Sequence, residues 1–248
     1  MAAALIVAVL LAVWEGIVRL GAVDDLLLPA PTQAAEALWT DRGLLADDLV
    51  VTTGEVLLGL AAAIAAGAAL GVAMHVSEPA RRALRPLVIG SQAVPVPVIA
   101  PLVVLVLGFG LAPKVLLVAL VCFFPIAINL YDGLRDTDPD ARKLLRSLDA
   151  TRWQTLRMLE APSALPAAFT GMKIAAAVAV IGAVFAEWSG AESGLGHALL
   201  TANGQLETPR AFAATLLLFL LAVALYGAFA LLERRAVDWT PRTTPGGP

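Results

Sequence analysis

The sequence predicts an all-α, polytopic membrane protein with about six transmembrane helices, and three observations lead to this fold class. Hydrophobic residues make up 59% of the 248 residues and charged residues only 15%, whereas a soluble domain carries roughly a quarter charged residues. Several apolar runs reach the roughly 18 residues needed to cross a hydrocarbon layer of about 30 Å. Basic residues gather in alternate segments between those runs. We therefore predict a single transmembrane domain over residues 1–248.

Six apolar segments are predicted to cross the membrane. They cover residues 2–20, 50–76, 87–107, 113–131, 166–188 and 211–232. The first is interpreted as a retained helix rather than a secretory signal, because no Lys or Arg precedes it and no A-x-A-like site follows. A short interfacial helix is expected within 28–49, and the tail 240–248 is expected to be disordered.

Two of these segments have a composition that predicts how they pack. The second carries Gly59, Gly67 and Gly71, which let a neighbouring backbone approach closely. The third carries Pro95, Pro97 and Pro101. Each proline removes a backbone hydrogen bond, which is tolerable at membrane depth only against protein or a wet cavity.

The distribution of Lys and Arg predicts the orientation of the chain. Most of the 17 basic residues lie in 77–86, in 132–165 and after residue 232. The segments 24–48 and 189–209 carry mainly acidic residues instead. Because basic loops stay on the cytoplasmic side, we expect both termini and the loop 132–165 to be cytoplasmic.

The loop 132–165 has the most informative pattern. Leucines and one tryptophan recur at helical spacing, with basic residues between them. Asp138 is expected to cap a first helix with Pro139 at its first position. Asp149 is expected to take a left-handed backbone in the turn that follows, and Pro162 and Pro166 are expected to end a second helix. Such a helical hairpin suits docking into a partner's groove, and it equally suits resting on anionic lipid.

This loop resembles the EAA loop of ABC-importer permeases. Lys143-Leu144-Leu145 stands where that family has Glu-Ala-Ala, Asp149 stands where it has Gly, and Leu159-Glu160-Ala161-Pro162 stands at its closing Ile-x-Leu-Pro. The resemblance extends over nearly the whole chain. It includes PVPVIAPLVVLVLGFGLAPK at 95–114, CFFPIAIN at 122–129, ATRW at 150–153, PSALP at 162–166, GMKIA at 171–175 and SGLG at 193–196.

The resemblance implies a function and a set of partners. In that family the loop inserts a coupling helix into a cleft on each ATPase, and the pore works by alternating access. The implied partners are two cytoplasmic ATP-binding subunits, an extracytoplasmic substrate-binding protein and a second permease copy, in the inner membrane of a bacterium. The implied ATPase-coupling residues are Lys143, Leu144, Leu145, Leu148, Asp149, Ala150, Thr151, Arg152 and Trp153.

The sequence does not predict an enzyme. It contains no Gly-rich phosphate loop with Lys-Ser/Thr, so we expect the partner subunits to bind ATP and this chain to hold no cofactor. A membrane-embedded enzyme would need clustered nucleophilic, acid–base or metal-binding residues, and none forms a spaced motif. The lone Cys122 excludes a disulfide framework, no metal site is expected, and the net charge of −3 gives no indication of nucleic acid.

Six residues are candidates for the substrate pathway: Gln92, Pro95, Pro97, Asn129, Glu187 and Trp188. The Glu187 carboxylate could accept a hydrogen bond from a ring amine, with Trp188 as a stacking face. The interpretation we favour is an interfacial tryptophan beside a solvated acid. GAVFAEW at 182–188 and FAATLLL at 212–218 look most like hydroxymethylpyrimidine permeases, so a thiamine-precursor pyrimidine is the expected substrate. A sulfonate, taurine or nitrate is the alternative in the same branch.

The remaining polar residues in the spans have simpler interpretations. Glu15 is expected to pair with Arg19 one turn later. Lys173 is expected to extend back to lipid phosphate. His75 and His197 are each expected to have structural roles, because they lie far apart and match no metal-ligand spacing.

Overall fold

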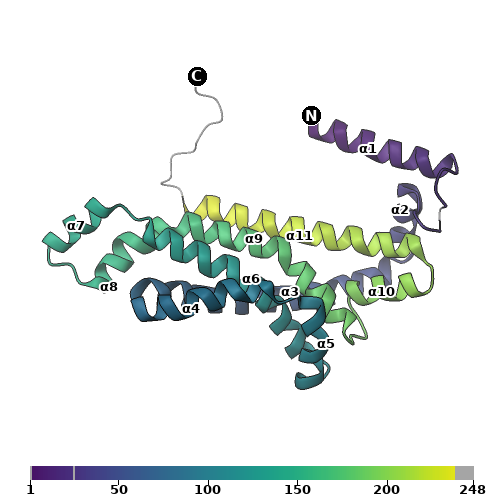
Figure 1. The fold of residues 1–248 in the computed structure, drawn as a ribbon. Coiled ribbons are helices and arrows are strands. Elements are labelled where there is room, and N and C mark those ends of the chain that lie inside the picture. The colour runs from purple at the N-terminus through teal and green to yellow at the C-terminus, as the bar shows by residue number, and fades with distance from the viewer. Residues whose placement is uncertain (1, 25, 238–248) are drawn as a thin grey trace. The chain divides into compact units, whose positions relative to one another are not determined.

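The computed structural model describes residues 2–24 and 26–237, and the tail expected to be disordered (240–248) lies outside them. Over the described residues the secondary structure is helical, with no strand, which confirms the all-α prediction. Figure 1 shows the order of the helices along the chain. Their bounds are α1 Ala2–Arg19, α2 Pro31–Thr40, α3 Arg42–Val76, α4 Glu78–Gly90, η1 Ser91–Ala93, α5 Val96–Leu107, α6 Leu111–Arg135, α7 Pro139–Ser147, α8 Arg152–Thr155, η2 Leu156–Glu160, α9 Ala161–Trp188, α10 Leu195–Gly204 and α11 Thr208–Ala236.

Four helical segments of the described chain are long and apolar enough to cross a membrane. They are α3, α6, the continuous run from α8 to α9, and α11. A fifth is added if α4–η1 and α5 cross as one broken span. The residues of the predicted first span form the 18-residue helix α1, which is not among these segments. A short helix was also expected within 28–49, and α2 lies there. Two helices extend beyond the predicted spans, since α3 begins at Arg42 and α9 at Ala161.

The predicted third span, 87–107, is not one continuous helix. The chain leaves the helical conformation at Val94, which has φ −80° and ψ 115°. The ring of the following Pro95 excludes the α conformation at the residue before it, which explains this break. Helix α5 then starts at Val96 with Pro97 in its first turn, where a missing N–H removes no helical hydrogen bond.

The prediction that Pro162 and Pro166 end the second helix of the loop is wrong. The chain remains helical from Arg152 to Trp188. Pro162 lies two residues after the π-helical turn η2, in which the Ala161 N–H bonds to the Leu156 carbonyl five residues back. Inserted turns of this kind absorb local irregularity without ending a helix. Pro166 lies inside α9, as membrane helices allow when neighbouring groups satisfy the freed carbonyl.

The chain forms two compact units, each with its own core. The first comprises the described residues of Met1–Gly59, Val96–Val118 and Val180–Ala222. Its main cluster of buried residues is Leu45, Val180, Leu195, Ala213, Ala214 and Leu218. A second cluster joins Ala100, Leu117 and Ala186. Close backbone approach supports this packing, because a Cβ at Gly182 would lie 3.0 Å from the Val118 Cα.

The second unit comprises the described residues of Leu60–Pro95, Ala119–Ala179 and Val223–Pro248. Its buried clusters are Met74, Val88, Ala127 and Tyr131, and Leu134, Leu156 and Ala164. Gly67 and Gly71 of α3 lie where this helix meets α6. A Cβ at Gly67 would lie 2.9 Å from the Ile126 Cβ, and one at Gly71 would lie 2.9 Å from the Ala127 carbonyl oxygen. The prediction that these glycines admit a neighbouring helix is therefore confirmed.

Candidate functional site

The loop 132–165 folds into a helical hairpin made of α7 and α8 (Figure 1). Asp138 caps α7, its Oδ1 accepting a 2.8 Å hydrogen bond from the Asp140 N–H, and Pro139 occupies the first helical position. Asp149 has φ 58° between the helices. Thr151 caps α8, its Oγ1 accepting from the Gln154 N–H. The predictions for Asp138, Pro139 and Asp149 are confirmed.

All nine residues predicted for coupling lie on this hairpin, and its large apolar side chains point into solvent. Leu144 is 62% exposed, Leu148 69% and Trp153 68%. Leu145 and Ala150 are half-buried, while Lys143 is exposed and paired with Asp140 at 2.8 Å. Exposed apolar side chains of this size on a protruding turn indicate a surface that another molecule covers.

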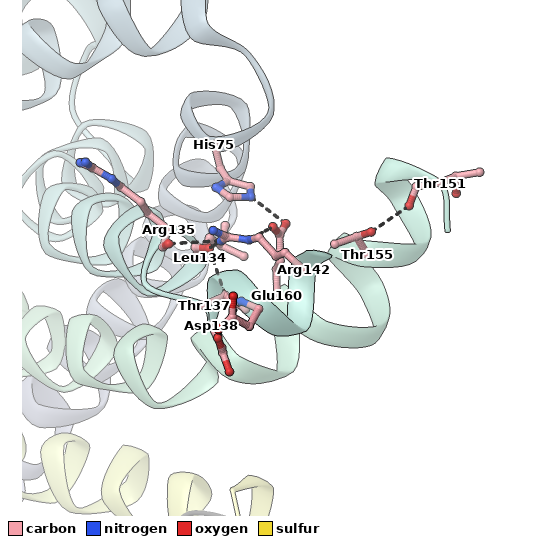
Figure 2. A network of polar contacts seen from close by, with 10 residues as sticks. His75, Leu134, Arg135, Thr137, Asp138, Arg142, Thr151, Thr155 and Glu160 are labelled. Carbon is pink, nitrogen blue, oxygen red and sulfur yellow. Dashed lines mark hydrogen bonds and ion pairs between the residues drawn. The ribbon is translucent and has the colours of Figure 1, made fainter. Parts of the chain in front are cut away.

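A buried carboxylate fixes the base of the hairpin, as Figure 2 shows. The Glu160 carboxylate, in η2, lies 2.7 Å from the His75 Nε2 through its Oε2 and accepts a 2.6 Å hydrogen bond from the Arg142 Nε through its Oε1. Arg142 also donates through Nη2 to the main-chain carbonyls of Leu134 at 2.6 Å and Arg135 at 3.2 Å. The Arg142 guanidinium therefore joins α7, the end of α6 and η2, and charge-assisted hydrogen bonds are stronger than those between neutral groups.

Sequence reasoning assigned Glu160 no role in this network. His75 was expected to have a structural role, and its bond to Glu160 supports that. The two residues lie 85 positions apart, so no local spacing connects them. The loop 132–165 also contains five aspartates, so the composition of the loop did not single out Glu160.

A second buried carboxylate organises the segment that follows α9. Glu187 is 1% exposed. Its Oε1 accepts a 2.7 Å hydrogen bond from the Thr52 hydroxyl, and its Oε2 accepts from the N–H groups of Gly196 at 2.5 Å and His197 at 3.2 Å. The Thr52 Oγ1 also accepts a 2.8 Å bond from the Leu195 N–H.

The SGLG segment at 193–196 therefore wraps around Glu187. Gly194 has φ +113°, and a Cβ there or at Gly196 would collide with the carboxylate. Asp48 holds the same turn, because its Oδ1 accepts from the Gly194 N–H at 2.7 Å. The interpretation of Glu187 as a solvated acid is wrong, because the carboxylate is buried and both of its oxygens accept hydrogen bonds from within the protein.

The other pathway candidates occupy separate positions. Trp188 is 41% exposed and donates from Nε1 to the Gly196 carbonyl at 2.9 Å. Gln92, Pro95 and Pro97 lie exposed around the break between η1 and α5. Asn129 is half-buried and donates from Nδ2 to the Pro125 carbonyl of its own helix at 2.7 Å. In the described part of the chain no hydrogen bond joins Gln92 to Asn129.

Glu15 behaves as the sequence indicates. Its Oε1 lies 2.6 Å from the Arg19 Nε, as predicted, and it also accepts from the N–H and hydroxyl of Thr32 at the start of α2. Lys173 does not extend to lipid phosphate as expected, because its Nζ lies 2.6 Å from the Glu233 Oε2.

One buried ion pair was missed from the sequence. The Lys114 Nζ lies 2.5 Å from the Glu55 Oε1, and the side chains are 12% and 4% exposed. The signal was available, because an acid within a predicted span is a functional or pairing residue by default. Over the described residues no group of three or more His, Cys, Asp or Glu side chains could hold a metal ion.

Residues 59–238 match the family described as "Binding-protein-dependent transport system inner membrane component". The chain is 36% identical over 231 residues to the formylaminopyrimidine transport permease protein ThiX of Halalkalibacterium halodurans, covering 93% of this chain and 92% of that protein. It is 32% identical over 239 residues to the taurine transport system permease protein TauC of Escherichia coli, covering 94% and 87%.

A solved structure shows the same fold. The structure of the MetNI methionine ABC transporter in an inward-facing conformation matches with a TM-score of 0.68 and 18% identity, over 79% of this chain and 97% of that chain. The family match extends over most of the chain and includes the hairpin and the Glu187 turn. The chain therefore belongs to the binding-protein-dependent transport system inner membrane component family, as the permease subunit of an ABC importer, and it is not an enzyme.

Proposed function

We propose that this permease imports a small aromatic heterocycle, most closely a thiamine-precursor pyrimidine, and that the α7–α8 hairpin couples its pore to ATP hydrolysis. A permease of this family works with ATPase and substrate-binding partners. In our proposal two copies of the chain form the pore, two cytoplasmic ATPases each receive one hairpin, and a binding protein delivers substrate from outside. ATP-driven movement of the hairpins then switches the pore between a state open to the outside and a state open to the cytoplasm.

The exposed apolar surface of the hairpin is the observation that carries the coupling proposal. Leu144, Leu148 and Trp153 are the side chains that a groove on the ATPase would cover. A central apolar contact in such an interface contributes about 2 kcal/mol or more. Leu148 is 69% exposed in the permease alone, so replacing it changes the stability of the permease fold by no more than about 0.5 kcal/mol.

Leu148→Asp tests this role directly. We expect the variant to insert into the membrane at wild-type levels, with substrate uptake and transport-stimulated ATP hydrolysis both lost. Asn203→Asp is the matched control, because it adds the same charge at an exposed position outside the loop. Normal uptake by Leu148→Asp would show that the hairpin does not dock on the ATPase and rests on lipid instead.

The orientation belongs to the same proposal. With 24–48 and 189–209 outside and 77–86 and 132–165 inside, single cysteines at positions 46 and 146 should respond differently to an impermeant thiol reagent in whole cells. Both positions are exposed, and Cys122→Ser removes the native thiol. We expect labelling at 46 alone, and strong labelling at 146 without labelling at 46 would reverse the orientation.

The ion pairs of the basic residues in the predicted spans support a heterocyclic rather than an anionic substrate. An anion pathway should offer unpaired basic side chains or helix N-termini at membrane depth. Each basic residue within the predicted spans instead has a carboxylate partner. The three pairs are Arg19–Glu15, Lys114–Glu55 and Lys173–Glu233. This favours a neutral or weakly cationic substrate over nitrate or a sulfonate, in line with a relative named for formylaminopyrimidine transport.

Growth assays distinguish the two substrate classes. The permease, expressed with its partner subunits, should rescue a strain that must import a thiamine-precursor pyrimidine and fail to rescue one that must import a sulfonate. Rescue on the sulfonate but not on the pyrimidine would overturn the heterocycle assignment, while the permease function and the coupling role would stand.

A further inference from the structure

A cavity of about 510 Å³ lies on the inner side of the hairpin, between it and the end of α3. Its lining includes Arg142, Arg146, Arg152 and Trp153 from the hairpin, His75 from the last turn of α3, and Glu160 from η2. All six belong to the second compact unit. Of the three side chains assigned to ATPase docking, Leu144 and Leu148 do not line this cavity, whereas Trp153 does.

The lining carries excess positive charge. Glu160 is the one acidic residue in it, and its two oxygens are already bonded to His75 and Arg142. Arg146 and Arg152 are exposed, and neither makes an ion pair within the described part of the chain. Two guanidinium groups without a counter-charge therefore face a cavity that is much larger than a single ion.

Helix geometry separates this cationic face from the leucine face of α7. Side chains four positions apart share a helix face, as Arg142 and Arg146 do. Leu144 lies two positions from each of these arginines, or about 200° around the helix, and Leu148 follows directly after the end of α7. The arginine face can therefore hold a ligand while the leucine face is covered by a partner.

The position of the cavity indicates the source of its ligand. His75 and Val76 end a helix that is long and apolar enough to cross a membrane, and Glu160 lies near the start of another such segment. We therefore infer that the cavity lies near the level of the lipid headgroups. Basic pockets at this depth bind anionic lipid headgroups. The exposed indole of Trp153 also suits the boundary between headgroups and acyl chains.

We propose that this cavity binds the phosphate of an anionic phospholipid headgroup through Arg146 and Arg152, with Arg142 held in place behind them by Glu160. Arginine forms paired hydrogen bonds to phosphate oxygens, which a single ammonium cannot do. The bound lipid would brace the hairpin against the end of α3. The inference rests on the membrane location of the chain and does not depend on ATPase docking.

Lipid binding to the purified full-length permease tests the proposal. Native mass spectrometry in detergent would compare phosphatidylglycerol with phosphatidylcholine for wild type, Arg146→Gln/Arg152→Gln and Arg157→Gln. Arg157 is an exposed basic residue of η2 that does not line the cavity, so it is the matched control. Each basic residue near a membrane surface contributes about fivefold to anionic lipid binding, so the double variant should lose roughly 30-fold in affinity for phosphatidylglycerol.

Three further results bear on the assignment. Arg146→Lys/Arg152→Lys should keep most of the preference for phosphatidylglycerol, because it keeps the charge. An unchanged preference in the double glutamine variant, or an equal loss in Arg157→Gln, would overturn the proposal. Displacement of the lipid by inorganic phosphate at the same concentration would also overturn it, because the site would then bind free phosphate rather than a headgroup.

Discussion

Replacement of Glu187 by alanine should strongly destabilise the permease. The carboxylate is almost fully buried and accepts hydrogen bonds from the Thr52 hydroxyl and from the N–H groups of Gly196 and His197. Alanine removes the acceptor for all three donors at once. It also leaves an empty volume under the SGLG turn, which is shaped around the carboxylate.

The expected loss follows from these contacts. A buried donor left without an acceptor costs about 1–3 kcal/mol. Because neighbouring contributions are not additive and His197 is only half-buried, we expect a total of about 3–5 kcal/mol. Glu187→Gln keeps an oxygen for the two N–H groups and changes only the contact with Thr52, so its cost should be about 1–2 kcal/mol. At about 3 °C per kcal/mol for a chain of this length, the Tm should fall by roughly 10–15 °C for alanine and about 5 °C for glutamine.

The chain supplies its own reporter for this measurement. Cys122 is the single cysteine and is fully buried, so a fluorogenic maleimide reacts with it only as the protein unfolds in detergent. Glu192→Ala is the matched control, because that acid is exposed on the same loop and its removal should change the Tm little. A Tm for Glu187→Ala within 3 °C of wild type would refute the reasoning, as would an equal loss for Glu192→Ala.

Two further predictions use the same Tm measurement. Gly67→Ala should lower the free energy of unfolding by about 1–3 kcal/mol, because its Cβ would meet Ile126 at 2.9 Å. Gly54→Ala on the same helix has open space and should raise the free energy of unfolding by up to about 1 kcal/mol. Equal losses of stability in the two variants would contradict this prediction. Arg210 holds the pKa of Asp41 below its usual value by donating a hydrogen bond to it. This pair therefore stabilises the fold fully above the pKa of Asp41 in the unfolded chain, about 3.9. The stabilisation decreases as the pH falls through the lower pKa of Asp41 in the folded protein. The Tm gap between wild type and Arg210→Gln should therefore narrow below about pH 4, and a gap that stays constant down to pH 3 would contradict the linkage.

Features that depend on neighbouring residues could be predicted from the sequence. The Asp138 cap, the left-handed backbone of Asp149 and the Glu15–Arg19 pair each involve residues within four positions of one another. These interactions depend on local geometry, because a side chain can contact its own or the next helical turn in only a few conformations. The helical hairpin of the loop could be predicted for the same reason.

Contacts between distant helices could not be predicted in this way. Thr52 lies 135 positions from Glu187, and Lys173 lies 60 from Glu233. In a soluble helix the apolar stripe shows which face is buried, but a membrane helix is apolar towards both lipid and protein, so its rotation is not visible in the pattern. An isolated acid such as Glu55 or Glu187 shows that a partner exists without showing which residue it is.

The π-helical turn at 156–160 sets the rotation of the hairpin about the axis of α9, the helix that follows. A turn closed by an i→i+5 bond holds one residue more than an α-turn, and one residue corresponds to about 100° of rotation and 1.5 Å of length. Deleting a single residue there would leave two regular helices but turn the hairpin about 100° around the α9 axis. Glu160 would keep His75 and lose Arg142, and Leu148 and Trp153 would face a different direction. The length of this short segment, independently of the side chains on the hairpin, thus sets the direction in which the proposed docking surface faces relative to α9.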